Sequence, residues 1–472
     1  MKKFLALILA LLMVLPVVGC GNKEKEPSGG DDEVKVEPGS NKSASGETDK
    51  DVYIDMWGVY ADDNYRAEYL MKLGEEFAKK YEEENGISVQ IEYYCQDDYG
   101  GCATKLAAGV SGGALPVLCQ ISSQQCPVFA PLCDDVRNYM DKATVDNYLD
   151  GLLVGCVDKD GKVFAVPGGR SFACMVVNLD LVKQAGYTQD DLKTWNWDKF
   201  HEVMLAVSKL GDDIEGAGLW WDTDAWIYES TLYSNGGNID NEDGTKITFA
   251  DTAAGGKFLD LVAEMMADGS MYSCYNEKAA KEVGDALNAL FAEGKLGCRF
   301  CSITNYGGIK KLMGEQSADK QFEFVLAHQP AGDAGFSIVT GGNNFLFLKQ
   351  STETQKKVAA AYLAYMAQDQ YVAEWNDLSG YMAFTESVYD STYYAEVAKD
   401  PNQVFIGEGI QYAHGRPVTL NWAECRKYLM DGLVGWSQDP AAYKAANGGT
   451  TDAVVKGWAE HCQKILDEAA AG

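Results

Sequence analysis

The sequence predicts an α/β fold, because strand-like and helix-like hydrophobic periods follow each other soon after residue 50. Apolar residues alternate with polar ones from Val52 to Trp57, which is the period of a strand. From Leu70 to Glu84 they recur every three or four positions, which is the period of an amphipathic helix. Alternation returns over residues 87–94, after the helix-ending pair Asn85-Gly86. Strand, helix and strand in this order predict the βα unit of an α/β domain.

Length and charge narrow the class of protein. The chain has 472 residues, 46% of them hydrophobic, which is enough for two to three domains with sizeable cores. Its formal net charge is −30, so the sequence argues against binding to nucleic acid or to anionic lipid surfaces. No segment after the N-terminal region reaches 18 consecutive apolar residues, so we expect no transmembrane helix there.

The N-terminus has the pattern of a secretory signal peptide. Lys2 and Lys3 precede an uncharged apolar run, Phe4–Val18, which is shorter than the roughly 20 residues needed to span a bilayer. The sequence Val17-Val18-Gly19-Cys20 that ends this region resembles the lipobox of bacterial lipoproteins. That resemblance implies a signal peptide over residues 1–19 and an acylated Cys20 as the mature N-terminus. It also implies a protein held by lipid at the extracytoplasmic face of the cell membrane.

Residues 20–50 are expected to be a disordered linker. They consist mainly of Gly, Asn, Lys, Glu, Asp, Ser and Pro, and such a composition cannot bury a core. A flexible coil of this length spans roughly 30 Å, so the folded body from residue 51 onward could work away from the membrane surface.

Cysteine usage leaves three alternatives open. The chain has 13 cysteines, and the remaining 12 after Cys20 sit singly among apolar or small residues, as buried thiols do. Disulfides are the second alternative, because an exported protein can form them. Metal binding is the third, but the lone pair Cys298 and Cys301 lies in an apparent strand, where positions three apart face opposite sides. We expect no metal and no cofactor.

Two motifs match enzyme or metal patterns only formally. Residues 109–113 spell GxSxG, but the predicted order is helix, turn, strand, and a nucleophile elbow requires strand, turn, helix. Residues 240–244 are acidic but lack the spacing of a calcium loop, so a polar hairpin turn is the favoured interpretation.

A set of short motifs in a shared order is similar to one family. The chain resembles the extracellular solute-binding proteins (family 1) of ABC importers, which include the maltose-binding and glycerol-3-phosphate-binding proteins. The second half resembles the glycerol-3-phosphate-binding branch most. The motifs that carry the likeness are Lys105–Gly109, Gly113–Pro116, Val166–Gly168, Ser234–Gly237, Gly297–Ser302, Thr340–Asn344, Ser379–Tyr381 and Asn421–Arg426.

The resemblance implies a two-lobed periplasmic-binding-protein fold of type II. Each lobe would be a mixed sheet flanked by helices, and hinge crossovers would join the lobes with the ligand in the cleft between them. Lobe 1 would comprise residues 51–166 and 336–381, and lobe 2 residues 167–335 and 382–472. Ligands of open α/β sheets do bind beyond the carboxyl ends of strands.

The resemblance also implies a set of ligand contacts. Trp226 matches a ligand-stacking aromatic residue, and Tyr381 and Arg426 match positions that hold ligand oxygens or phosphate. Trp220 and Trp221 stay open between ligand stacking and core packing. The full set implied is Trp57, Arg170, Ser171, Trp226, Ser302, Gly341, Gly342, Asn343, Asn344, Tyr381 and Arg426.

The functional expectation is a receptor rather than an enzyme. We expect a monomer that captures a carbohydrate or polyol and delivers it to an ABC permease. A glycerol-3-phosphate or glycerophosphodiester ligand is the alternative, although Asn343 and Asn344 replace smaller residues of that branch and their amides suit hydroxyl-rich ligands. An exported glycoside hydrolase, which would use two carboxylates, is a remote alternative. Among 70 acidic residues some pair of carboxylates looks suitable by chance, so such a pair is no evidence for hydrolysis.

Overall fold

The computed structural model describes residues 51–221, 225–318, 320–414 and 422–471. The chain divides into two compact units: unit 1 comprises the residues up to Gly168 with Asn343–Tyr371, and unit 2 comprises Gly169–Gly342 with Val372–Gly472. The chain passes between the two units after Gly168, Gly342 and Tyr371. The lobe boundaries expected from the sequence place these passages after residues 166, 335 and 381. The first two passages fall inside continuous strands, each at a pair of glycines, Gly168-Gly169 and Gly341-Gly342.

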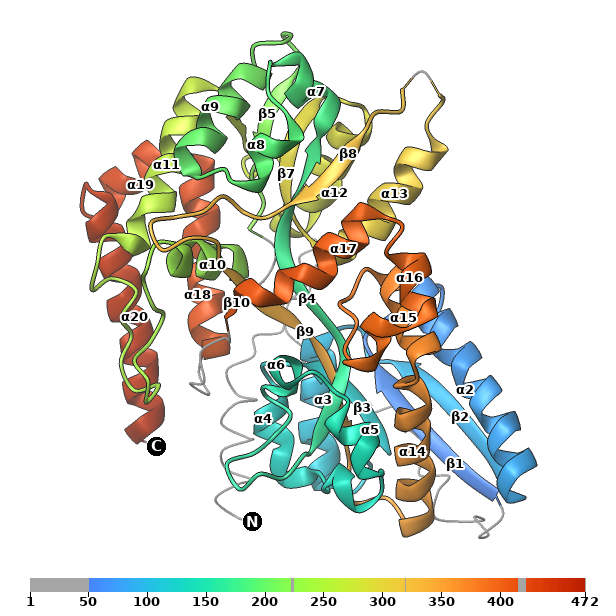
Figure 1. Ribbon diagram of the computed structural model, residues 1–472. Coiled ribbons are helices and arrows are strands. Elements are labelled where there is room, and N and C mark those ends of the chain that lie inside the picture. The colour runs from blue at the N-terminus through green and yellow to red at the C-terminus, as the bar shows by residue number, and fades with distance from the viewer. Residues whose placement is uncertain (1–50, 222–224, 319, 415–421, 472) are drawn as a thin grey trace, which may run out of the picture. The chain divides into compact units, whose positions relative to one another are not determined.

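Unit 1 is an α/β unit around the strand order β2-β1-β3-β9. Strand β1 is parallel to both β2 and β3, and the final part of β9 is antiparallel to β3. Helices α2 and α14 pack together and against β2 and β1 (Figure 1). Strands β4 and β9 and helix α15 are shared by both units. The elements are β1 Asp51–Gly58, α2 Tyr65–Asn85, β2 Ser88–Cys95, α3 Tyr99–Gly112, β3 Leu118–Ser122, α4 Cys126–Phe129, η2 Ala130–Leu132, η3 Val136–Asn138, α5 Lys142–Asp146, α6 Asp150–Leu153, β4 Ala165–Asn178, β9 Ile338–Phe347, α14 Glu353–Met366 and α15 Asp369–Ser379.

The first elements of unit 1 confirm the predicted βα unit. The side chain of Asn64 accepts a hydrogen bond from the backbone N–H of Arg66 and so caps the start of α2. Gly86 ends this helix in the left-handed conformation, with φ of 66°. The order α3, turn, β3 over residues 99–122 is likewise confirmed, so the GxSxG at 109–113 is a helix end and lacks the context of a nucleophile elbow.

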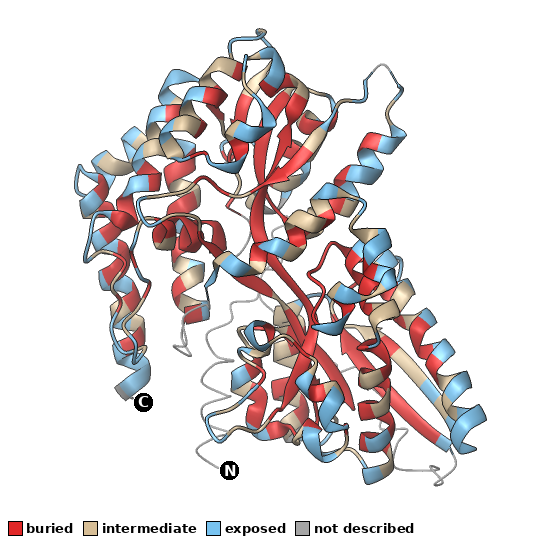
Figure 2. Ribbon diagram, in the orientation of Figure 1, coloured by how far each residue is buried: buried red, intermediate tan, exposed pale blue. Residues whose placement is uncertain are grey.

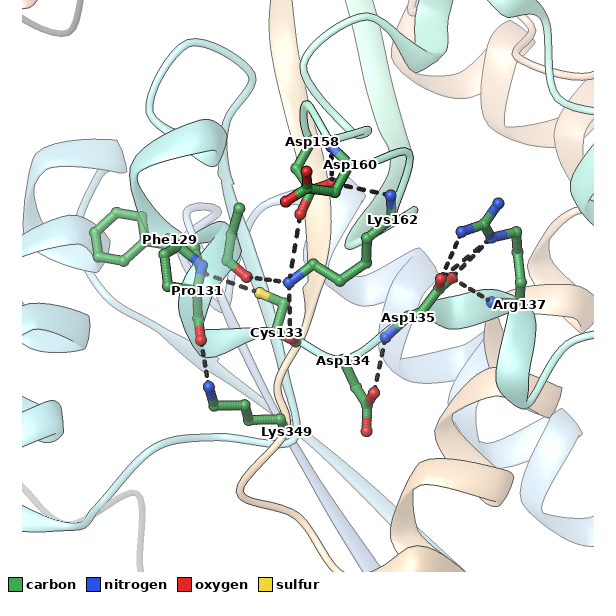
Figure 3. Close-up of polar contacts among 11 residues, drawn as sticks. Phe129, Pro131, Cys133, Asp134, Asp135, Arg137, Asp158, Asp160, Lys162 and Lys349 are labelled. Carbon is green, nitrogen blue, oxygen red and sulfur yellow. Dashed lines mark hydrogen bonds and ion pairs between the residues drawn. The ribbon is translucent and has the colours of Figure 1, made fainter. Parts of the chain in front are cut away.

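Lysine side chains close the carbonyl ends of the short helices in unit 1 (Figure 3). The Nζ atom of Lys162 donates to the carbonyl oxygens of Ala130 at 2.7 Å and Cys133 at 3.3 Å, and Lys349 donates to the carbonyl of Pro131. A cation at the C-terminal end of a helix satisfies carbonyl groups that have no partner within the helix. These two lysines hold residues 130–133 in place within the connection between β3 and β4.

A buried cation ties α14 to the loop after η2. The ammonium of Lys356 donates to Asp134 Oδ2 at 3.0 Å and to Glu353 Oε1 at 2.8 Å, and its side chain is only 9% exposed. Burial alone would raise the pKa of the Asp134 carboxyl, but hydrogen bonds from Lys356 and from the backbone of Asp135 bring that pKa below its usual value. The ion pair therefore stabilises the folded form while Asp134 is ionised.

Replacing Lys356 by methionine should lower the free energy of unfolding by about 2 kcal/mol, since it leaves a partly buried carboxylate without its cation. Because the folded-state pKa of Asp134 is depressed, this contribution is present above the unfolded pKa and is lost as the pH falls through the folded one. Urea unfolding at pH 7 and at pH 3 checks both expectations. Lys357→Met, at the exposed neighbouring position, is the matched control and should have little effect.

Unit 2 is a second α/β unit, with β8, β4, β7, β5 and β6 side by side in that order. Strand β4 is antiparallel to β7 and β8, whereas β5 is parallel to β7 and β6, so this sheet is mixed as predicted. Its further elements are α7 Leu179–Gln184, α8 Gln189–Lys193, α9 Trp197–Val207, β5 Glu215–Gly218, α10 Trp226–Ser234, α11 Ala254–Asp268, β6 Met271–Tyr272, α12 Ala280–Ala292, β7 Leu296–Ser302, η4 Ile303–Asn305, α13 Tyr306–Glu315, β8 Phe324–Ala327, η5 Ser387–Asp390, α16 Thr392–Val397, α17 Pro401–Glu408, η6 Gly409–Tyr412, β10 Ala413–His414, α18 Trp422–Gln438, α19 Pro440–Ala446 and α20 Thr451–Ala471.

The core of unit 2 explains its apolar strands. All fourteen residues of β4 and all seven of β7 are buried, and Figure 2 shows these strands in red beneath helices whose outer faces are exposed. Helix α9 packs against β5 and β7, and α12 packs against β7. Helices α11, α18 and α20 pack against one another. Strands that are buried on both faces have nearly continuous apolar sequences rather than alternating ones.

The thiols in the described part of the chain are free. Eleven of these 12 cysteines are buried, and Cys95 is partly buried. Cys298 and Cys301 both lie on β7, as predicted, and point to different neighbours: Cys298 contacts Met204, and Cys301 contacts Cys174. Within the described residues no group of three or more His, Cys, Asp and Glu side chains is placed to hold a metal ion, and no helix is long and apolar enough to cross a membrane.

Candidate functional site

Unit 1 has a buried hydrogen-bond network centred on Asn343. Gln120 on β3 donates from Nε2 to Asn343 Oδ1 at 2.8 Å. The amide nitrogen of Asn343 then donates to the hydroxyl oxygens of Tyr60 and Tyr99, each at 3.1 Å. Tyr60 follows β1 and Tyr99 begins α3, so residues far apart in the sequence meet beyond the carboxyl end of β1. This is the edge at which α/β sheets bind ligands.

The geometry fixes the orientation of each amide in this network. Asn343 Oδ1 is an acceptor, so the other amide atom of Asn343 must be the donor that holds the two tyrosines. The backbone N–H of Tyr60 donates to the hydroxyl of Tyr93 at 2.8 Å, which holds the chain after β1 in place. Asn343 itself is fully buried, and its role is to position the hydroxyl groups of Tyr60 and Tyr99.

The other two candidates in unit 1 are core residues in this structure. Trp57 lies in a buried cluster with Cys102, Leu106 and Cys119, and its ring packs rather than facing an open surface. Asn344 is also fully buried and donates to the Cys126 thiol at 3.5 Å. The side chains that hydrogen-bond to Asn343 are instead those of Tyr60, Tyr99 and Gln120, which the sequence analysis did not identify.

In unit 2 the two predicted glycines allow strands to approach closely. Gly342 has φ of 102°, and a Cβ atom there would overlap the carbonyl oxygen of Gly169 and lie 3.0 Å from the Cα of Arg170. A Cβ on Gly341 would lie 2.9 Å from Cζ3 of Trp226. Both positions therefore exclude a side chain, one against backbone and the other against an indole ring.

Arg170 and Tyr381 lie close to this glycine pair of β9. Arg170 is buried, and its Nη2 donates to Thr340 Oγ1 at 3.3 Å, while its carbonyl accepts a hydrogen bond from the N–H of Met382 at 2.8 Å. The Tyr381 ring lies against Gly169 and stacks on Trp375 at a centroid distance of 6.0 Å. Gly341, Gly342, Arg170, Tyr381 and Trp226 thus form one neighbourhood in unit 2.

The three tryptophans that the sequence left open have different environments. Trp221 is a core residue, since its Nε1 donates to Ser437 Oγ at 2.6 Å and its ring packs edge-on against Phe258. Trp220 stacks with the guanidinium of Arg299, 5.1 Å from the ring centroid. Trp226 begins α10, is largely buried, and its Nε1 has no hydrogen-bond partner among the described residues.

The remaining candidates are dispersed within unit 2. Ser302 ends β7, and its hydroxyl oxygen accepts from the N–H of Thr304 at 3.2 Å, which caps the turn that follows. Ser171 is buried on β4. Arg426 lies half-buried on α18, and burial lowers the pKa of its guanidinium to about 10. The predicted lipidation site, Cys20, lies outside the described residues.

The comparisons with known proteins agree with this architecture. A family model described as "Bacterial extracellular solute-binding protein" matches residues 76–405. A curated relative, the arabinooligosaccharide-binding protein of Bacillus subtilis (strain 168), is 24% identical over 215 residues, which are 44% of this chain. The match spans only 43% of the length of that relative.

Solved structures of binding proteins superpose on most of the chain. Maltose-bound MalE3 of T. maritima has a TM-score of 0.69 at 18% identity, covering 88% of this chain and 99% of that one. UgpB of Mycobacterium tuberculosis, in complex with glycerophosphocholine, has a TM-score of 0.69 at 20% identity with the same coverage. At these identities the likeness establishes the fold, which is the two-lobed α/β fold of MalE-like proteins.

Proposed function

We propose, from the premise that this chain belongs to the family of bacterial extracellular solute-binding proteins, that it is the receptor of an ABC importer for a carbohydrate or polyol. The observation that carries the choice of ligand is the neutral network around Asn343. Amides and tyrosine hydroxyls offer both donors and acceptors without charge, which suits a ligand rich in hydroxyl groups. Trp226 and Tyr381 would supply aromatic faces for the C–H surface of a sugar.

The proposed mechanism is reversible binding without chemistry. A ligand that binds one conformation better than another shifts the population toward it, and the ligand-bound form would be the one that the permease engages. No step requires a nucleophile or a general base. The relatives support this class of ligand, since one is described as binding an arabinooligosaccharide and another was solved with maltose.

A glycerophosphodiester is the second candidate ligand, and Arg426 is the observation that favours it. Its guanidinium is half-buried on α18 and is a cation at neutral pH, and a guanidinium binds phosphate oxygens through strong charge-assisted hydrogen bonds. UgpB of M. tuberculosis was solved with glycerophosphocholine and shares the fold. A phosphate-bearing ligand should therefore lose affinity on replacement of Arg426 by methionine, whereas a neutral sugar that does not use Arg426 should keep its affinity.

A thermal-shift screen tests the proposed function. The purified protein is heated with maltose, arabino-oligosaccharides, glycerol-3-phosphate and glycerophosphocholine, and each mixture is analysed afterwards for products. A receptor should melt at a higher temperature with at least one of them, because binding to the folded state alone stabilises it. The remote alternative, an exported glycoside hydrolase, would instead release shorter sugars.

The proposed attachment to the membrane depends on Cys20. We expect residues 1–19 to be removed, Cys20 to carry acyl chains and residues 20–50 to act as a leash that keeps the receptor near its permease. Cys20→Ser should release the protein from the membrane fraction and leave ligand affinity unchanged. Immunoblotting of membrane and soluble fractions checks this, and retention of the variant in membranes would contradict lipidation at Cys20.

A further inference from the structure

The side-chain amide of Gln329 is buried without hydrogen bonds. The residue is 3% exposed, and neither its Nε2 nor its Oε1 has a hydrogen-bond partner among the described residues. Gln355, which is 2% exposed, shows the usual arrangement: Nε2 donates to the carbonyl of Tyr53 at 2.9 Å, and Oε1 accepts from the N–H of Thr352 at 2.9 Å. Leaving a buried polar group unsatisfied costs about 1–3 kcal/mol, so Gln329 requires an explanation.

Gln329 lies at the carboxyl edge of the sheet in unit 2. Strand β8 ends at Ala327, which pairs with Met175 of β4, so the chain beyond it continues toward Ala173. Ala173 pairs in turn with Ser302, the last residue of β7. The carboxyl ends of β7 and β8 therefore lie at one edge, and this is the edge of an α/β sheet where ligands bind.

The backbone on both sides of Gln329 is held rigidly. Trp195 donates from its indole Nε1 to the carbonyl of His328 at 3.0 Å, and the N–H of Ala331 donates to the carbonyl of Trp195 at 3.0 Å. The His328 ring packs on Phe336 at a centroid distance of 5.4 Å. The amide is thus presented from a fixed main chain, as preorganised binding groups are.

A second buried polar group without a partner lies on the same connection between β8 and β9. The hydroxyl of Ser337, which follows Phe336, is buried and has no hydrogen-bond partner among the described residues. The contact between His328 and Phe336 brings the two ends of this connection together, so Gln329 and Ser337 each flank a residue of one packed ring pair. The connection therefore holds two buried polar groups that a ligand bound at this edge of the sheet would satisfy.

We propose that Gln329 is a ligand-binding residue that recognises adjacent hydroxyl groups of a carbohydrate, with Nε2 donating to one hydroxyl oxygen and Oε1 accepting from the other hydroxyl. The inference rests on the proposed function and names the chemistry that this part of unit 2 selects. An amide presents a donor and an acceptor side by side, and so does a pair of neighbouring hydroxyls. A ligand lacking one of these hydroxyls leaves a buried group unpaired and is rejected.

The test is Gln329→Met, which keeps the length of the side chain and removes both polar atoms. Calorimetric titration with maltose and with arabinotriose should show affinity at least about tenfold weaker than that of the unmodified protein, the scale expected for losing hydrogen bonds to buried groups. The unfolding temperature without ligand should stay the same or rise, because an unsatisfied amide has been replaced by an apolar group. Gln355→Met is the matched control: it should lower the unfolding temperature and leave affinity unchanged.

Three outcomes separate the inference from the proposed function. If the unmodified protein binds a sugar and Gln329→Met binds it equally well, the inference is overturned and the receptor function stands. If Gln329→Met unfolds at a lower temperature with unchanged affinity, the amide is held by an internal water molecule and the inference is again overturned. If the unmodified protein binds neither these sugars nor glycerophosphocholine, the proposed function is contradicted, and so is the role of Gln329 that depends on it.

Discussion

Gly342→Ala should destabilise the protein by about 4 kcal/mol or more, a size that single substitutions seldom reach. Two effects add at this position. Gly342 has a positive φ of 102°, and a backbone in the left-handed region costs a residue with a side chain about 1–2 kcal/mol. The new Cβ would in addition overlap the carbonyl oxygen of Gly169, which is a backbone atom and cannot rotate away. Urea unfolding followed by tryptophan fluorescence measures the loss.

Gly335→Ala separates the two effects. Gly335 has nearly the same φ, 101°, but a Cβ there would have no described atom within 4 Å. This variant should lose only the conformational part, about 1–2 kcal/mol. Equal losses for Gly335→Ala and Gly342→Ala would contradict the close approach of Gly342 to Gly169, and with it the packing that places Arg170 beside Thr340.

Asn343→Leu should have the second largest effect, because one amide holds three other side chains. Its replacement removes the acceptor for Gln120 and the donor for Tyr60 and Tyr99. We expect a loss of stability of about 3 kcal/mol, since Gln120 is fully buried and its Nε2 is left without an acceptor. Ligand affinity should fall as well, because the tyrosine hydroxyls are no longer positioned. Urea unfolding and calorimetric titration measure the two effects.

The neighbouring Asn344→Leu is the control for Asn343→Leu. Asn344 is equally buried, but its side chain donates a hydrogen bond to the Cys126 thiol, and its Oδ1 has no partner among the described residues. Its replacement should therefore cost much less stability. Loss of affinity without loss of stability in Asn344→Leu would mean that this amide, and not the Asn343 network, meets the ligand.

Elements with local signals were predictable from sequence. The alternation from Val52, the helical spacing up to Glu84 and the stop at Gly86 depend on near neighbours, and the structure confirms each of them. The two-unit division follows less directly, because β4 and β9 are continuous strands that begin in one unit and end in the other. Each passage coincides with a glycine pair, Gly168-Gly169 or Gly341-Gly342, and a glycine pair alone does not show that the surrounding core changes.

The candidate site was predictable only in part, since its polar contacts are long-range. Gln120 and Asn343 are 223 positions apart, and Tyr60 and Asn343 are 283 apart, so no spacing rule connects them. Burial also could not be predicted from the sequence. Trp57 and Trp221 are tryptophans, as many ligand-stacking residues are, but both lie inside cores. Gln329 was not predictable, because a glutamine two positions after the apolar strand Phe324–Ala327 would ordinarily be exposed, and only the structure shows that it is buried.

One calorimetric titration shows whether this family member binds a sugar and leaves it unchanged. Purified protein is titrated with maltose, arabinotriose and glycerophosphocholine in turn, and the ligand is recovered afterwards and identified by mass spectrometry. We expect saturable binding of at least one sugar at one site per chain, with the recovered sugar intact. Binding of glycerophosphocholine alone, or recovery of a cleaved sugar, would contradict it.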